Sequence, residues 1–149
     1  MTNLFYYALA IIAGVMLSTQ AGINAQLRTA VGDPVMAALV SFLVGTAALL
    51  FYVLIFNKEN NGLMDSLKDM SLYKWSGGLI GALYVTGVII VAPRIGASNT
   101  AGLIVAGQIL FALFLDHYGL LGFAQHQANY MRVAGAVLLI AGVFLILKN

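Results

Sequence analysis

The sequence predicts an all-α integral membrane protein, a single domain over residues 1–149 with five transmembrane helices. Of the 149 residues, 62% are hydrophobic and only 8% are charged, whereas soluble domains are about half apolar and about a quarter charged. Lipid must therefore cover much of the apolar surface. Five segments are apolar enough, and near enough to about 20 residues, to cross about 30 Å of hydrocarbon as helices. Tyrosine and tryptophan residues lie near the ends of these segments, as is typical of a membrane interface.

The first two predicted helices are separated by a turn. The first runs from about Leu4 to Gln26 and the second from about Pro34 to Phe56. Gly32-Asp33-Pro34 is a turn signal between them. Pro34 suits the first turn of the second helix, because a missing N–H costs nothing there.

The other three helices are predicted from about Trp75 to Ala92, from about Ser98 to Leu115 and from about Arg132 to Leu147. The third is expected to stop at Pro93. The connection 93–96 is so short that the third and fourth helices are expected to be antiparallel neighbours. The polar connection 57–74 contains apolar residues near helical spacing. They indicate either a short helix on the membrane surface or a solvated loop.

Lysine and arginine residues are divided almost evenly between the two sides of a five-helix chain. One side holds Lys58, Lys68, Lys74 and Arg132, and the other holds Arg28, Arg94 and Lys148. Orientation follows this asymmetry, so the chain can insert either way up. Because five is odd, an inverted second copy would give the inverted-repeat arrangement of many secondary transporters. The alternative is that the balance is accidental and the chain inserts one way.

Several classes of function are excluded by composition. The chain has no cysteine, which excludes disulfides, iron–sulfur clusters and Cys-ligated zinc. Its net charge of +2 comes without a basic patch, so nucleic acid is not an expected partner. We find no Ser/His/Asp array, no phosphate-binding glycine loop and no metal-ligand cluster. We therefore expect no enzyme activity, no cofactor and no metal.

Six stretches in order along the chain carry a family resemblance. They are TQAGINAQLR (19–28), AALVSFLVGT (37–46), GGLIGALYV (77–85), VAPRIGAS (91–98), AGQILFALFLDHYGLLG (106–122) and RVAGAVLLIAGVFLI (132–146). In these the chain resembles the YdcZ-like family of the drug/metabolite transporter superfamily. The resemblance implies an EamA-like half-transporter unit of five helices, a bacterial inner-membrane location and export. It also implies a dual-topology homodimer or pairing with an oppositely oriented paralogue, but it names no substrate.

Four polar residues within the predicted helices are candidate substrate-binding groups. Gln20 and Asn24 lie one turn apart on one face of the first helix, while Tyr84 and Gln108 lie near the middle of the third and fourth helices. Polar groups inside hydrocarbon are costly and often functional. The alternative is that they bond one another between helices, which we favour for Asn24 because it lies close to the interface.

Charged residues near helix ends are candidates for coupling or capping. Asp116 and His117 could exchange protons, although an interfacial cap is the favoured reading. Arg94 could attract an anionic group or satisfy carbonyls at a helix C-terminus, and capping is again favoured. No Asp or Glu lies deep within a predicted helix, and this disfavours proton-coupled export of a hydrophobic cation.

Glycines on the third and fourth helices are expected to support helix packing. They are Gly77, Gly81, Gly102 and Gly107. From these observations we expect an alternating-access transporter of a small polar metabolite or drug, embedded in lipid as an antiparallel dimer. The alternatives are a passive channel and a non-transporting scaffold or accessory subunit.

Overall fold

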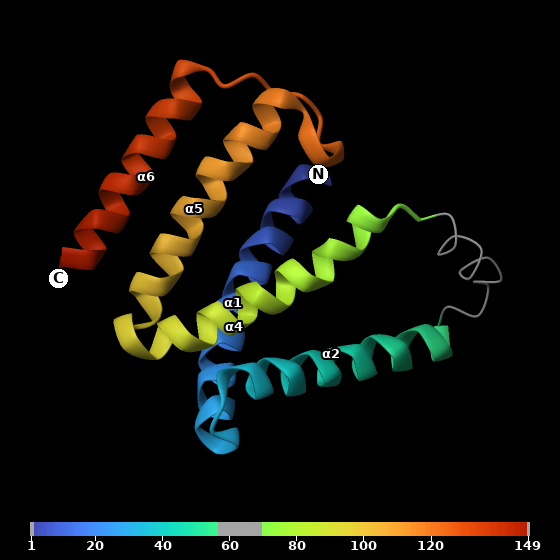
Figure 1. Ribbon diagram of the computed structural model, residues 1–149. Coiled ribbons are helices and arrows are strands. Elements are labelled where there is room, and N and C mark those ends of the chain that lie inside the picture. Colours follow the sequence, from blue (N-terminus) through green and yellow to red (C-terminus); the bar gives the residue numbers. More distant parts are fainter. Residues whose placement is uncertain (1, 57–69, 149) are drawn as a thin grey trace. The chain divides into compact units, whose positions relative to one another are not determined.

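The computed structural model describes residues 2–56 and 70–148, and all regular structure within them is helical (Figure 1). The elements are α1 (Thr2–Val31), α2 (Pro34–Phe56), the short 3-10 helix η1 (Leu72–Trp75), α4 (Ser76–Ile95), α5 (Ala97–Tyr118), the 3-10 helix η2 (Leu120–Gly122) and α6 (Tyr130–Lys148). Among these residues, five helices are long and apolar enough to cross a membrane. The predicted fold class is confirmed. The segment 57–69, for which a surface helix or loop was considered, lies outside the described residues.

Helix α2 has the expected bounds, whereas the other helices are longer than predicted. Helix α1 continues through Val31, and at about 1.5 Å per residue its 30 residues reach about 45 Å. Helix α4 does not stop at Pro93 but continues to Ile95, so that Gly96 alone separates it from α5. Hydropathy marks the part of a helix that lies in lipid, and a helix can continue beyond that part as long as its backbone groups find partners.

The turn between α1 and α2 forms as the sequence indicates. Gly32 adopts φ +80° and donates its N–H to the carbonyl of Arg28 at 2.8 Å, which ends α1. Asp33 then accepts the backbone N–H of Met36 on its Oδ1 at 2.8 Å. Asp33 is therefore the N-cap of α2, and Pro34 occupies the first helical position. Both residues favour the start of a helix at this point.

The chain divides into two compact units, Met1–Pro93 and Arg94–Asn149. In the first, a small core forms where α2 meets α4, from Ala37, Ala38, Val85 and Ile89. Leu27 of α1 and Tyr84 of α4 pack against this core. The expected antiparallel contact between α4 and α5, which lie largely in different units, stays a prediction.

In the second unit, α5 and α6 lie side by side as an antiparallel hairpin (Figure 1). Ala136 and Val143 of α6 are buried, and Thr100 of α5 is buried with its hydroxyl donating to the carbonyl of Gly96 at 2.7 Å. Most large apolar side chains in both units remain exposed, such as Leu138 at 72% and Leu49 at 70%. Such a surface requires lipid or another apolar partner to cover it.

Candidate functional site

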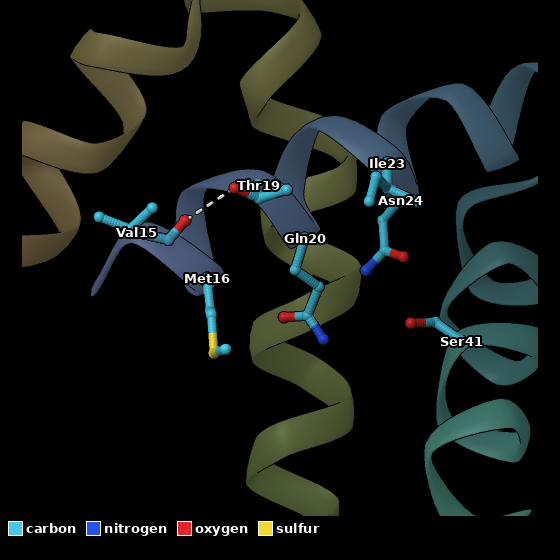
Figure 2. A pocket seen from close by; sticks show the side chains of 7 residues that line it. All are labelled: Val15, Met16, Thr19, Gln20, Ile23, Asn24 and Ser41. Atoms are coloured by element: carbon cyan, nitrogen blue, oxygen red, sulfur yellow. Dashed lines mark hydrogen bonds between the residues drawn. The ribbon is translucent and has the colours of Figure 1, made fainter. Parts of the chain in front are cut away.

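A pocket of about 300 Å³ lies between α1 and α2. Seven residues line it, six of them from α1 (Figure 2): Val15, Met16, Thr19, Gln20, Ile23, Asn24 and Ser41. Three are apolar and four are neutral and polar. The pocket therefore offers both hydrogen-bonding groups and an apolar wall, the combination typical of small-molecule sites.

Asn24 is the most informative residue of this pocket. The residue as a whole is only 3% exposed, but its amide, which makes no hydrogen bond within the described residues, is open to the pocket, since no buried side-chain N or O atom among those residues is without a partner. The amide points into the pocket (Figure 2), where it is available to donate and accept hydrogen bonds with a bound molecule.

Two further polar groups face the same space. Gln20 lies one helical turn before Asn24, and Ser41 approaches from α2 (Figure 2). Neither side chain makes a hydrogen bond within the described residues. The hydroxyl of Thr19, by contrast, already donates to the carbonyl of Val15 at 2.9 Å. Two amides and one hydroxyl are thus available to a ligand.

The local sequence explains this arrangement. Residues four apart on a helix share a face, so Gln20 and Asn24 project together from α1. On α2 the same spacing relates Ala37, which is fully buried, to Ser41. Close packing at Ala37 therefore fixes the rotation of α2 and turns Ser41 toward the pocket.

A cation holds α1 against α4 just beyond the pocket. Arg28 donates from Nη1 to the carbonyl of Ile89 at 3.3 Å. In a regular helix that carbonyl would accept the N–H of residue 93, but residue 93 is proline, which has none. Arg28 therefore supplies the hydrogen bond that Pro93 removes. This contact offsets part of the cost of a proline within the helix and accounts for the continuation of α4 past Pro93.

The four predicted binding residues do not all meet in one place. Gln20 and Asn24 line the pocket, whereas Tyr84 packs against the core of Ala37, Ala38, Val85 and Ile89 together with Leu27. Gln108 is exposed on α5, in the other unit, and makes no hydrogen bond within the described residues. Ser41 was not predicted, although a serine within the very apolar α2 is a signal that could have identified it.

Asp116 and His117 take part in a hydrogen-bonded connection at the end of α5. Asp116 pairs with Arg132 of α6 at 3.2 Å, and the Arg132 Nη1 also donates to the carbonyl of His126 at 3.1 Å. The Nδ1 of His117 accepts the N–H of Ala128 at 3.1 Å. The Asp116 side chain thus joins α5 to α6, and the His117 side chain holds the 119–129 connection against α5.

The remaining predicted residues differ in their surroundings. Arg94 is exposed in the last turn of α4 and makes no hydrogen bond or ion pair with the described residues. A Cβ at Gly102 would meet Val143 of α6 at 3.4 Å, and one at Gly81 would meet Phe42 of α2 at 3.7 Å. A Cβ at Gly77 or Gly107 would meet nothing within 4 Å. Close packing therefore involves Gly81 and Gly102.

Comparison with known proteins identifies a family and a relative that match most of the chain. The family described as "Putative inner membrane exporter, YdcZ" matches residues 5–145. The inner membrane protein YdcZ of Escherichia coli (strain K12) is 26% identical over 142 residues, covering 95% of this chain and 94% of that protein. No solved structure matches.

Proposed function

The chain belongs to the YdcZ family of inner membrane exporters, and from this membership we propose that it exports a small polar solute by alternating access. Membership makes it a multi-pass protein of the inner membrane with the role of a transporter. The proposal adds the pocket between α1 and α2 as the site where the solute binds.

The observation that carries this proposal is the amide of Asn24. The residue is buried, but its amide opens into the pocket and makes no hydrogen bond within the described residues. A group that served only to join helices would be bonded to its neighbour. A solute that enters the pocket would satisfy Asn24 together with Gln20 and Ser41.

Transport is tested in proteoliposomes with a panel of radiolabelled polar metabolites. Solutes taken up by the wild type are retested with Asn24→Leu and Gln20→Met, which keep side-chain size but remove the amides. Gln26→Met is the matched control, because Gln26 lies exposed on the same helix outside the pocket. We expect the pocket variants to lose most uptake and the control to retain it. Equal uptake by all variants would refute this site, and ionic conduction in planar bilayers would indicate a channel instead.

The working form is proposed to be an antiparallel dimer. Its support is the near-even division of four against three basic residues between the two sides, together with the largely exposed apolar surface that a second copy can cover. An inverted pair would provide ten helices around a central path.

Orientation is tested by cysteine labelling, which the cysteine-free chain makes simple. Ser71→Cys and Ser98→Cys place single labels before α4 and, at the start of α5, after it, at positions that are exposed. Intact cells are treated with an impermeant thiol reagent. Dual orientation predicts that about half of each variant reacts. Complete reaction of one and none of the other would show a single orientation and rule out an antiparallel homodimer.

A further inference from the structure

The pocket between α1 and α2 has no ionisable side chain in its lining. Its polar groups are the amides of Gln20 and Asn24 and the hydroxyls of Thr19 and Ser41. Each of these groups has both a hydrogen-bond donor and an acceptor. None can balance a full charge on a ligand.

The nearest charged residues on either side of the pocket do not line it. Arg28 lies one turn beyond Asn24 but donates to the carbonyl of Ile89. Asp33 accepts the N–H of Met36 as the cap of α2. Neither lines the pocket. A charged solute in the pocket would therefore meet no counter-charge among the residues that line it, and an unpaired charge within the membrane is strongly unfavourable.

We infer that the pocket selects an uncharged amphiphilic solute with a hydrogen-bond donor and acceptor side by side, such as a carboxamide. This inference rests on the proposed function and names its substrate class. The polar end of the solute bonds the amides of Asn24 and Gln20, and Ser41 completes the contact from α2. The apolar end lies against Val15, Met16 and Ile23.

The size of the pocket indicates how much of a solute it holds. A volume of about 300 Å³ is at the lower end of ligand sites. A water molecule occupies about 30 Å³ of liquid, so the pocket accommodates about ten groups of that size. A single amino-acid derivative therefore fills the pocket, and because the pocket is open, the rest of a larger solute would lie outside it.

Binding is measured with three matched probes that share one apolar tail. N-acetyl-leucinamide is neutral at pH 7, N-acetyl-leucine is an anion and leucinamide is a cation. The corresponding valine and phenylalanine probes form two more series. The full chain in nanodiscs is titrated with each probe, and binding is followed by saturation-transfer NMR. We expect the neutral probe of at least one series to bind about tenfold or more tightly than both charged forms.

Variants connect this preference to the pocket. Asn24→Leu is expected to weaken binding of the neutral probe about tenfold, the effect of one lost hydrogen bond. Asn24→Asp introduces a carboxylate and should shift the preference to the cation. Ser41→Ala provides a mild test from the other helix should Asn24→Leu fail to fold, and Gln26→Met should leave binding unchanged.

The outcomes separate the substrate class from transport itself. Binding of a charged form as tight as that of the neutral form, or no binding of any neutral probe, would overturn the inference. Neutral binding that depends on Asn24, without flux in proteoliposomes, would uphold the inference for the site and refute the proposed transport. Flux of a charged solute that depends on Asn24 would uphold the proposed transport and refute the inferred substrate class.

Discussion

Replacement of Arg28 by methionine tests whether this arginine substitutes for the hydrogen bond that Pro93 removes. The carbonyl of Ile89, a residue with no exposed surface, would lose the donor at 3.3 Å. A hydrogen bond to a charged donor contributes about 1.5–3 kcal/mol in soluble proteins, while side-chain bonds between membrane helices average about 0.6 kcal/mol. Because 3.3 Å is long, we expect a loss of about 1 kcal/mol in the free energy of unfolding.

The proline provides the decisive second variant. Pro93→Ala restores a backbone N–H that can bond the Ile89 carbonyl within the helix. Arg28→Met should then cost much less in the Pro93→Ala background, giving a coupling energy of about 0.5–1 kcal/mol in a double-mutant cycle. Unfolding in mixed detergent micelles measures each variant. Arg94→Met is the control, because it removes an exposed arginine that lies next to Pro93 on α4. An equal cost of Arg28→Met in both backgrounds would refute the reasoning.

Three further predictions concern the second unit. Gly102→Leu should lower the free energy of unfolding by about 1–3 kcal/mol, because even a Cβ would lie 3.4 Å from Val143; Gly77→Leu, at an open position, should have little effect, and equal losses in mixed micelles would contradict the packing argument. Asp116→Asn should lower the free energy of unfolding by at most about 1 kcal/mol, since its ion pair with Arg132 is partly exposed. The same variant should transport any substrate at the wild-type rate. If wild-type flux depends on a pH gradient and Asp116→Asn abolishes that flux, Asp116 would instead be assigned to proton coupling. Gln108→Leu, on an exposed face, should leave probe binding in nanodiscs unchanged, and weaker binding would place Gln108 in the site.

The helices could be predicted from sequence because they depend on local properties. Hydropathy over about 20 residues locates five spans, and Gly32-Asp33-Pro34 predicts the turn that the structure contains. The end of α4 could not be predicted in this way. Pro93 has the chemistry of a helix terminator, but its effect is offset by Arg28, a residue 65 positions earlier in the sequence.

The candidate site shows the same division between local and distant effects. Gln20 and Asn24 share a pocket because their spacing on one helix is enough to place them together. Tyr84 also lies in a helix of the first unit, but the rotation of α4 turns it to the core. That rotation follows from packing between helices, as does the approach of Ser41. Neither is encoded in the spacing of residues within one segment.

The uncharged lining of the pocket has a consequence for the energy of transport. Moving one elementary charge across a membrane changes the free energy by about 2.3 kcal/mol per 100 mV. A pocket lined by Gln20, Asn24 and Ser41 that carries a neutral solute moves no charge when loaded and none when it returns empty. The membrane potential would then neither drive nor oppose export. Net flow would follow the concentration difference of the solute, and accumulation against that difference would require an ion bound elsewhere in the chain.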